Sequence, residues 1–299
     1  MQTQREFLQL RSHLEQVIVG QSALLDRLMI ALLTGGHILL ESLPGLAKTT
    51  AVTTLASGVH ASFQRIQFTP DLMPGDLTGT DIFEPQHGTF RFIAGPLFHE
   101  IVLADEINRA PPKVQSALLE AMQEHQITVG GVTRPLPEAQ LDRFLLHVVL
   151  QYPTADDELL ILQRDRARHY GADKPVLHSP LHPQQVLQAR REVAEVHVAP
   201  ELERYIVALV GATRDLGQFD AAWADYLQVG ASPRASIALL RASSALAYLR
   251  GREYVVPDDI IDIAPDVLRH RLVLGYAARA AGVDANAVVR KVLAGVAIP

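Results

Sequence analysis

Apolar residues in the first half of the chain follow two different spacings. They recur every three or four residues over about 7–18 and 24–32, and again after residues 48 and 111, which is typical of amphipathic helices. Short continuous apolar runs, typical of buried strands, lie at residues 37–40, 63–68, 101–104 and 145–150. Because these runs alternate with helices, we expect a mostly parallel sheet with helices covering both faces.

Two hairpins are predicted to interrupt this alternation. The runs 82–83 and 90–92 flank a turn at His87 and Gly88, and the runs beginning at Gln126 and Val132 flank a pair of glycines. Apolar runs separated by glycine-containing turns are typical of antiparallel hairpins.

The second half of the chain is predicted to be helical. Thr154 is placed to cap a helix together with Asp157. Further helical patterns lie near 184–196, 201–216, 233–250 and 258–270. We therefore expect two domains, a strand-containing core over residues 1–152 and an all-helical domain over residues 153–299.

Composition excludes several functional classes. The chain has 299 residues, of which 48% are hydrophobic and 20% charged, as in ordinary globular proteins. It has no cysteine, which excludes disulfides, thiolate metal sites and thiol nucleophiles. No apolar run is long enough to span a bilayer, and the first residues lack the pattern of a secretory signal. The net charge of −6 argues against nucleic acid as a partner. These features predict a cytoplasmic protein that binds neither membrane nor nucleic acid.

A phosphate-binding loop is the strongest local motif. It lies between a predicted strand and a predicted helix, where backbone amides and the positive end of the helix dipole can hold phosphate oxygens. The residues expected to bind nucleotide are Ser42, Leu43, Pro44, Gly45, Leu46, Ala47, Lys48, Thr49 and Thr50. Lys48 would reach the β- and γ-phosphates and the Thr49 hydroxyl would bind Mg²⁺. Ser42 and Ala47 stand where the usual motif has glycine, so a plain strand–turn–helix with a solvated lysine is the alternative.

A second motif supports nucleotide binding. The apolar run 101–104 ends in Asp105 and Glu106. At the end of a strand in the same sheet, Asp105 would hold Mg²⁺ and Glu106 would polarise the attacking water. A solvated acidic pair at a strand end is common, but the two motifs in this order favour an ATP and Mg²⁺ site.

With these motifs, the chain closely resembles the MoxR family of AAA+ ATPases from about residue 17 to residue 274. The resemblance rests on long strings of sequence rather than on one motif. The strings lie at residues 19–21, 35–37, 44–49, 67–72, 76–80, 104–112, 136–144 and 232–235.

The resemblance implies a P-loop AAA+ core of α/β class, a helical lid and a ring of subunits, typically hexameric. It implies that Val19 lies near the adenine, although plain packing at a helix end explains Val19 equally well. Arg143 matches the arginine finger, which reaches the nucleotide of a neighbouring subunit, and Arg234 matches the sensor 2 arginine. Both would be catalytic, with Lys48 and Glu106. The family's partners imply a client or a protein with a von Willebrand A domain.

One departure from the family is large. After the second hairpin the family has a further core strand, which ends in a polar residue called sensor 1. Here residues 131–137 run directly into residues 138–143, with no apolar run of about five residues between them. We therefore expect the central sensor 1 strand to be missing. Its neighbours would keep unpaired backbone groups unless they closed up and paired directly.

Three functions remain open from the sequence. The first is an ATPase that couples hydrolysis to remodelling or maturation of partner proteins. The second is a nucleotide-binding scaffold subunit, whose hydrolysis is impaired because the sensor 1 strand is absent. A nucleic-acid motor ranks third, because no basic stretch interleaved with aromatic residues occurs.

Overall fold

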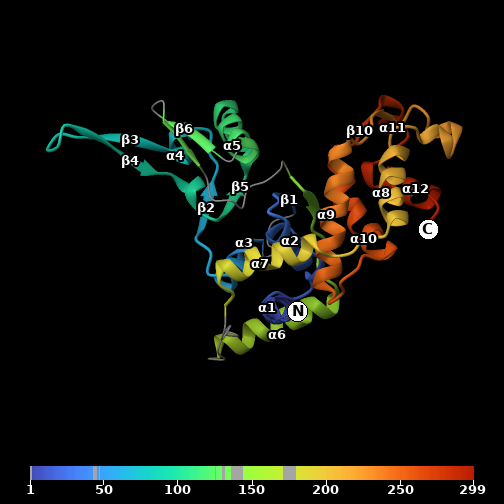
Figure 1. The fold of residues 1–299 in the computed structure, drawn as a ribbon, viewed down its shortest axis with the longest axis horizontal. Coiled ribbons are helices and arrows are strands. Elements are labelled where there is room, and N and C mark those ends of the chain that lie inside the picture. Colours follow the sequence, from blue (N-terminus) through green and yellow to red (C-terminus); the bar gives the residue numbers. More distant parts are fainter. Residues whose placement is uncertain are drawn as a thin grey trace.

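The computed structural model describes most of the chain. The described residues are 2–42, 46, 48–124, 126–129, 132–135, 144–170 and 180–299. Figure 1 shows a core of strands and helices beside a group of helices formed by the C-terminal part of the chain. The division at residue 152 stays a prediction.

Two helices open the chain, as the apolar spacing predicts. They are α1 (Gln2–Val17) and α2 (Ser22–Thr34). Phe7, Leu10 and Leu14 form the buried face of α1. The second helix ends at Gly35, which adopts a left-handed conformation with φ of +67°. A residue without Cβ is favoured there, and the chain then turns into the first strand.

The remaining core elements agree with the predicted strand–helix alternation. The strands are β1 (Ile38–Glu41), β2 (Phe63–Gln67), β5 (Ile101–Asp105) and β8 (Leu146–Val149). The helices are α3 (Lys48–Gly58), α4 (Pro74–Thr78), η1 (Pro96–Phe98), η2 (Ile107–Arg109) and α5 (Pro112–Glu124). The short helices α4 and η1 were not predicted, because five and three residues are too few for a periodic signal.

The parallel strands form two separate pairs instead of one continuous sheet. β1 pairs with β8, with Ile38 opposite Leu146, and β2 pairs with β5, with Phe63 opposite Ile101. Within the described ranges, no strand lies between β1 and β5, and these two strands do not pair with each other. The sequence places the gap over residues 131–143, and of these 131 and 136–143 lie outside the described residues, so the loss of the central strand stays a prediction.

Both predicted hairpins are confirmed. The first consists of β3 (Gly79–Glu84) and β4 (Thr89–Ala94), and the second of β6 (Gln126–Val129) and β7 (Val132–Pro135). The β3–β4 hairpin projects away from the core at the edge of the molecule (Figure 1).

The C-terminal part is helical, as predicted. Its helices are α6 (Ala155–His169), α7 (Pro183–Ala194), α8 (Pro200–Ala212), α9 (Pro233–Leu249), α10 (Pro257–Leu268), α11 (Tyr276–Ala280) and α12 (Ala285–Gly295). Short 3₁₀ turns lie at η3 (Leu216–Gln218), η4 (Ala221–Trp223) and η5 (Arg269–Arg271). Two short strands, β9 (Leu227–Val229) and β10 (Val273–Leu274), pair antiparallel among the helices. Such short strands leave no periodic pattern in the sequence.

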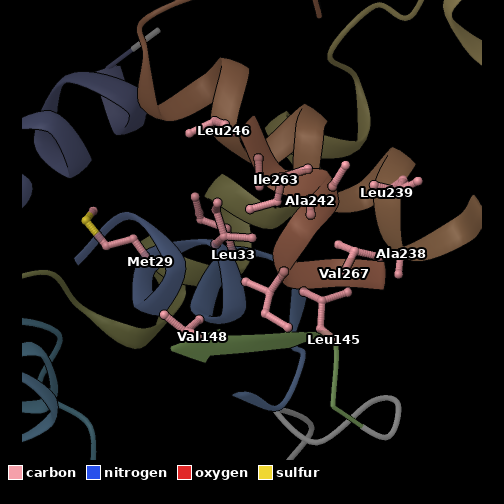
Figure 2. Packing of buried hydrophobic residues seen from close by; sticks show 14 of the residues in the cluster. Met29, Leu33, Leu145, Val148, Ala238, Leu239, Ala242, Leu246, Ile263 and Val267 are labelled. Atoms are coloured by element: carbon pink, nitrogen blue, oxygen red, sulfur yellow. The ribbon is translucent and has the colours of Figure 1, made fainter. Parts of the chain in front are cut away.

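One hydrophobic core joins the first helices to the C-terminal helices. Met29 and Leu33 of α2 and Val148 of β8 pack with residues of α9 and α10, such as Leu246 and Ile263 (Figure 2). All five side chains are buried. The helical lid is therefore held to the β1–β8 side of the core by ordinary hydrophobic burial.

A buried ion-pair network crosses the same contact. Arg27 of α2 donates hydrogen bonds to Asp262 at 2.8 Å and to Asp266 at 2.7 Å, both on α10. Burial lowers the pKa of Arg27, but the two carboxylates outweigh it and the net shift is upward. The guanidinium is therefore charged and paired between core and lid.

Candidate functional site

The described end of the phosphate-binding motif, residues 48–50, opens a helix as the sequence predicts. Helix α3 begins at Lys48, just after strand β1. Lys48 and Thr49 are half-buried in its first turn. Amides in the first turn of a helix have no partner within the helix, so this position favours bound anions.

The acidic pair lies at the end of β5. Asp105 is the last residue of the strand, and Glu106 follows it with φ of +58°. A left-handed backbone is uncommon at residues other than glycine and is often found at functional sites. This turn leads the chain into η2.

Three polar side chains hold this acidic pair. Arg65 of β2 donates from Nη2 to Oδ2 of Asp105 at 2.6 Å. Gln67 donates from Nε2 to Oε2 of Glu106 at 2.9 Å, and Arg109 contacts the same oxygen at 3.1 Å. The sequence motifs did not reveal these partners. Arg65 and Gln67 alternate along a predicted strand, which places them on one face, but their contact with the acids depends on the β2–β5 register.

A single cavity of about 1180 Å³ brings the two motifs together. The predicted site residues that line it are Ser42, Leu46, Lys48, Thr49, Thr50, Asp105 and Glu106. Arg65 and Asn108 line it as well. The cavity is large enough for a ligand of nucleotide size, since ligand pockets usually measure about 300–1,000 Å³.

Not every predicted site residue is brought to this cavity. Val19 and Arg234 are not among its lining residues. Val19 is half-buried near the end of α1, and Arg234 is exposed in the first turn of α9. The other predicted residues, Leu43, Pro44, Gly45, Ala47 and Arg143, lie outside the described residues.

The donor set of the cavity fits Mg²⁺. Thr49 and Asp105 both line the cavity, and the Thr49 hydroxyl and the Asp105 carboxylate are hard oxygen ligands. The described residues contain no cluster of three or more His, Cys, Asp or Glu that could hold a metal. Mg²⁺ usually takes only one or two carboxylates from a protein and completes its shell with phosphates and water. A nucleotide-dependent Mg²⁺ site therefore suits these residues.

The lid contacts the core beside this site. In η5, the His270 Nε2 atom lies 3.0 Å from the Phe144 carbonyl oxygen, and Arg271 donates from Nη2 to the same oxygen at 3.1 Å. Phe144 lines the cavity just before β8. Burial, reinforced by the charge of Arg271, lowers the pKa of His270 to about 4.

Comparisons with known proteins agree with the fold. The family described as "ATPase family associated with various cellular activities (AAA)" matches residues 37–138, and an AAA lid domain matches residues 221–292. A crystal structure of a candidate ATPase from Cytophaga hutchinsonii superposes with a TM-score of 0.88 at 40% identity. It covers 99% of this chain and 96% of that chain.

Two relatives match along most of their length. The chaperone MoxR1 of Mycobacterium tuberculosis is 42% identical over 309 residues, covering 95% of this chain and 80% of the relative. The protein YeaC of Bacillus subtilis is 40% identical over 309 residues, covering 96% and 93%. Both alignments are longer than the 299 residues of this chain, so the relatives contain residues in the matched region that this chain lacks. With its AAA core, its lid and these relatives, the chain belongs to the MoxR family of AAA+ ATPases.

Proposed function

We propose that this chain binds ATP with Mg²⁺ in the cavity between the start of α3 and the end of β5. The observation that carries the proposal is that Lys48 and Thr49 line the same cavity as Asp105 and Glu106. Lys48 and the amides of the loop at residues 42–50 would hold the phosphates. Thr49 and Asp105 would hold Mg²⁺, which supplies charge neutralisation on the phosphate oxygens.

The same residues suit hydrolysis. Glu106 would accept a hydrogen bond from the attacking water and orient it toward the γ-phosphate. Arg143 and Arg234 belong to this proposal as residues that offset the charge of the transition state, Arg143 acting on the nucleotide of a neighbouring subunit. This role needs a closed oligomer, for which a hexameric ring is proposed from the family. Arg234 is exposed, as a residue that acts only in a closed lid or at a subunit contact would be.

The energy of hydrolysis would drive remodelling or maturation of a partner, for instance a protein with a von Willebrand A domain. The β3–β4 hairpin is the surface that we propose for this contact. Phe83 is 50% exposed and Phe90 is 72% exposed on it, and their rings lie 5.3 Å apart. Exposed aromatic side chains on a projecting element favour protein contacts. A cytoplasmic location, where ATP is supplied, belongs to the same proposal.

The divided sheet favours slow hydrolysis. β1 and β5 carry the two halves of the site, but within the described ranges no strand joins them. Catalysis depends on groups held to within fractions of an ångström, and a divided sheet fixes the distance between the halves less firmly. The alternative function, a scaffold subunit that binds nucleotide with little turnover, is favoured by this same observation.

Steady-state phosphate release tests the proposal. We expect ATP turnover well below that of the Bacillus subtilis relative, and none for Glu106→Gln. A second variant inserts the matching segment of that relative between Pro137 and Glu138, and it is expected to turn over faster. Turnover equal to that of the relative without the insertion would contradict slow hydrolysis. Turnover unchanged in Glu106→Gln would contradict the assigned role of Glu106.

A further inference from the structure

The cavity extends well beyond the nucleotide site, along the facing edges of β1 and β5. Its lining includes every residue of both strands, from Ile38 to Glu41 and from Ile101 to Asp105. Among the described residues, β1 pairs only with β8 and β5 pairs only with β2, so each has one edge without a described partner strand. The two remaining edges therefore face a common space.

Burial along these strands reflects the open edges. All residues of β5 are half-buried, as are the first three of β1. By contrast, Leu146 and Val148 of β8 are 0% and 5% exposed. Strands of a parallel sheet that have helices on both faces are normally buried. We attribute the partial exposure of β1 and β5 to the edge of each strand that has no described partner.

The faces of this space are apolar. Leu28 and Leu32 of α2 and Leu55 of α3 line it, and Leu118 and Met122 of α5 line it as well. An occupant thus meets two strand edges that no described strand pairs with, and hydrocarbon on its faces.

We propose that the cleft between β1 and β5 binds an extended apolar segment of a separate polypeptide, which adds as a parallel strand between them. Only an extended chain presents backbone donors and acceptors along both of its edges, as this cleft requires. The segment would have four or five residues, because β1 has four and β5 has five. A helix satisfies its own backbone groups and would leave both strand edges unpaired.

A second copy of this chain does not fit as the donor. The inserted strand must have both edges free, whereas each described strand is already paired on one edge. If another copy inserted one of its described strands, it would first have to break an existing strand pair such as β3–β4. A flexible segment of a partner pays no such cost, so a partner polypeptide is the occupant to which the proposal commits.

The test uses a synthetic peptide and the nucleotide-free full chain. The probe is fluorescein-labelled Lys-Lys-Val-Ile-Val-Ile-Val-Lys-Lys, and its matched control has proline at the central valine. Proline lacks the N–H group and fixes φ, so it cannot pair inside a sheet. Fluorescence anisotropy is expected to show saturable binding of the probe and at least about tenfold weaker binding of the control. Equal binding of both peptides would overturn the proposal.

Hydrogen exchange locates the binding site. We expect the probe to slow exchange of those amides in 38–41 and 101–105 that do not bond to β8 or β2, and we expect these amides to exchange readily in the free protein. Protection elsewhere would overturn the proposal. So would protection of these amides before the peptide is added, because the cleft would then already be filled. Protection that grows with protein concentration alone would identify a second copy as the occupant and equally overturn it.

A cavity-filling variant provides the matched test on the protein side. Leu32→Trp places a large ring in the cleft and is expected to abolish probe binding while the melting temperature is kept. Leu187→Trp is the control, because Leu187 is 41% exposed on α7 and does not line the cavity. Probe binding retained in folded Leu32→Trp would overturn the proposal. Since no nucleotide is present, these results are independent of whether the chain binds or hydrolyses ATP.

Discussion

Arg65 of β2 holds one carboxylate oxygen of Asp105 at the end of β5, with 2.6 Å between Nη2 and Oδ2. The other oxygen of Asp105 has no contact with this guanidinium, so it can accept a water or a metal ion. Carboxylates that bind metals are commonly fixed by such a second hydrogen bond. We therefore expect Arg65 to position Asp105 for Mg²⁺.

Removing this contact should weaken Mg²⁺ binding. Arg65→Met is expected to raise the Mg²⁺ concentration needed for half-maximal ATP binding by about tenfold or more. Arg65→Lys should recover part of the loss, because lysine can still donate to Asp105. Arg65 is 49% exposed, so its loss should change the melting temperature little. A Mg²⁺ titration monitored with a fluorescent ATP analogue measures the effect, and an unchanged midpoint in Arg65→Met would contradict the role.

Arg27 should contribute strongly to stability. Arg27→Met removes two charged hydrogen bonds, but Asp262 keeps Arg250 and Asp266 keeps Arg269, so the expected cost is about 2–3 kcal/mol. Urea denaturation measures the loss. Arg204→Met is the control, because its pair with Glu201 is exposed and should contribute less than about 1 kcal/mol. Equal stabilities for the two variants would show that the network does not hold the lid to the core.

His270 should make the stability of the protein depend on pH. Its pKa is about 4 in the folded protein and 6.5 ordinarily, so between these values the unfolded chain binds a proton that the folded chain does not. Its contribution is complete above pH 6.5 and is lost as the pH falls toward 4, with a slope of at most about 1.4 kcal/mol per pH unit.

The measurement is urea denaturation of the protein and of His270→Gln between pH 4.5 and 7. As the pH falls, the unfolding free energy of the unchanged protein is expected to decrease more than that of His270→Gln. A difference independent of pH would contradict the neutral, buried state of His270.

The β3–β4 hairpin should tolerate loss of its aromatic residues. Phe90 is 72% exposed, so Phe90→Ser is expected to change the unfolding free energy by no more than about 0.5 kcal/mol. Phe68 follows β2 and is 0% exposed, so it provides the contrast: Phe68→Ala should cost about 3–5 kcal/mol. Thermal denaturation compares the two variants. A large loss for Phe90→Ser would show that Phe90 packs in the fold and is not displayed for a partner.

Much of the fold could be predicted from the sequence, because apolar spacing and turn residues are local signals. Gly35 marked the end of α2, and the turn at His87 and Gly88 marked the first hairpin. α12 was not predicted, although Val288 and Val292 form its buried face. Its β-branched residues lie among alanines and glycines, and this composition gives a weaker helical signal.

The site could be predicted only in part. The chemistry of Lys48 and Asp105 follows from residue type and spacing, since both motifs are local. The contacts of Arg65 and Gln67 with the acids depend on how β2 and β5 align, and a single sequence does not specify that register. The loss of the central strand is predicted from a local gap in the apolar pattern, and no strand pairs with the facing edges of β1 and β5 among the described residues. That the two strand pairs would stay apart depends on packing across the whole core.

Every function proposed for this chain depends on nucleotide binding at Lys48, which calorimetry measures directly. Titration of a slowly hydrolysed ATP analogue with Mg²⁺ into the folded protein should show saturable binding near one site per chain. Lys48→Ala, which keeps helix α3, should weaken that binding by tenfold or more, because it removes a charge-assisted contact to phosphate. If the folded protein takes up no nucleotide, or if Lys48→Ala binds as well as the unchanged chain, the account is contradicted.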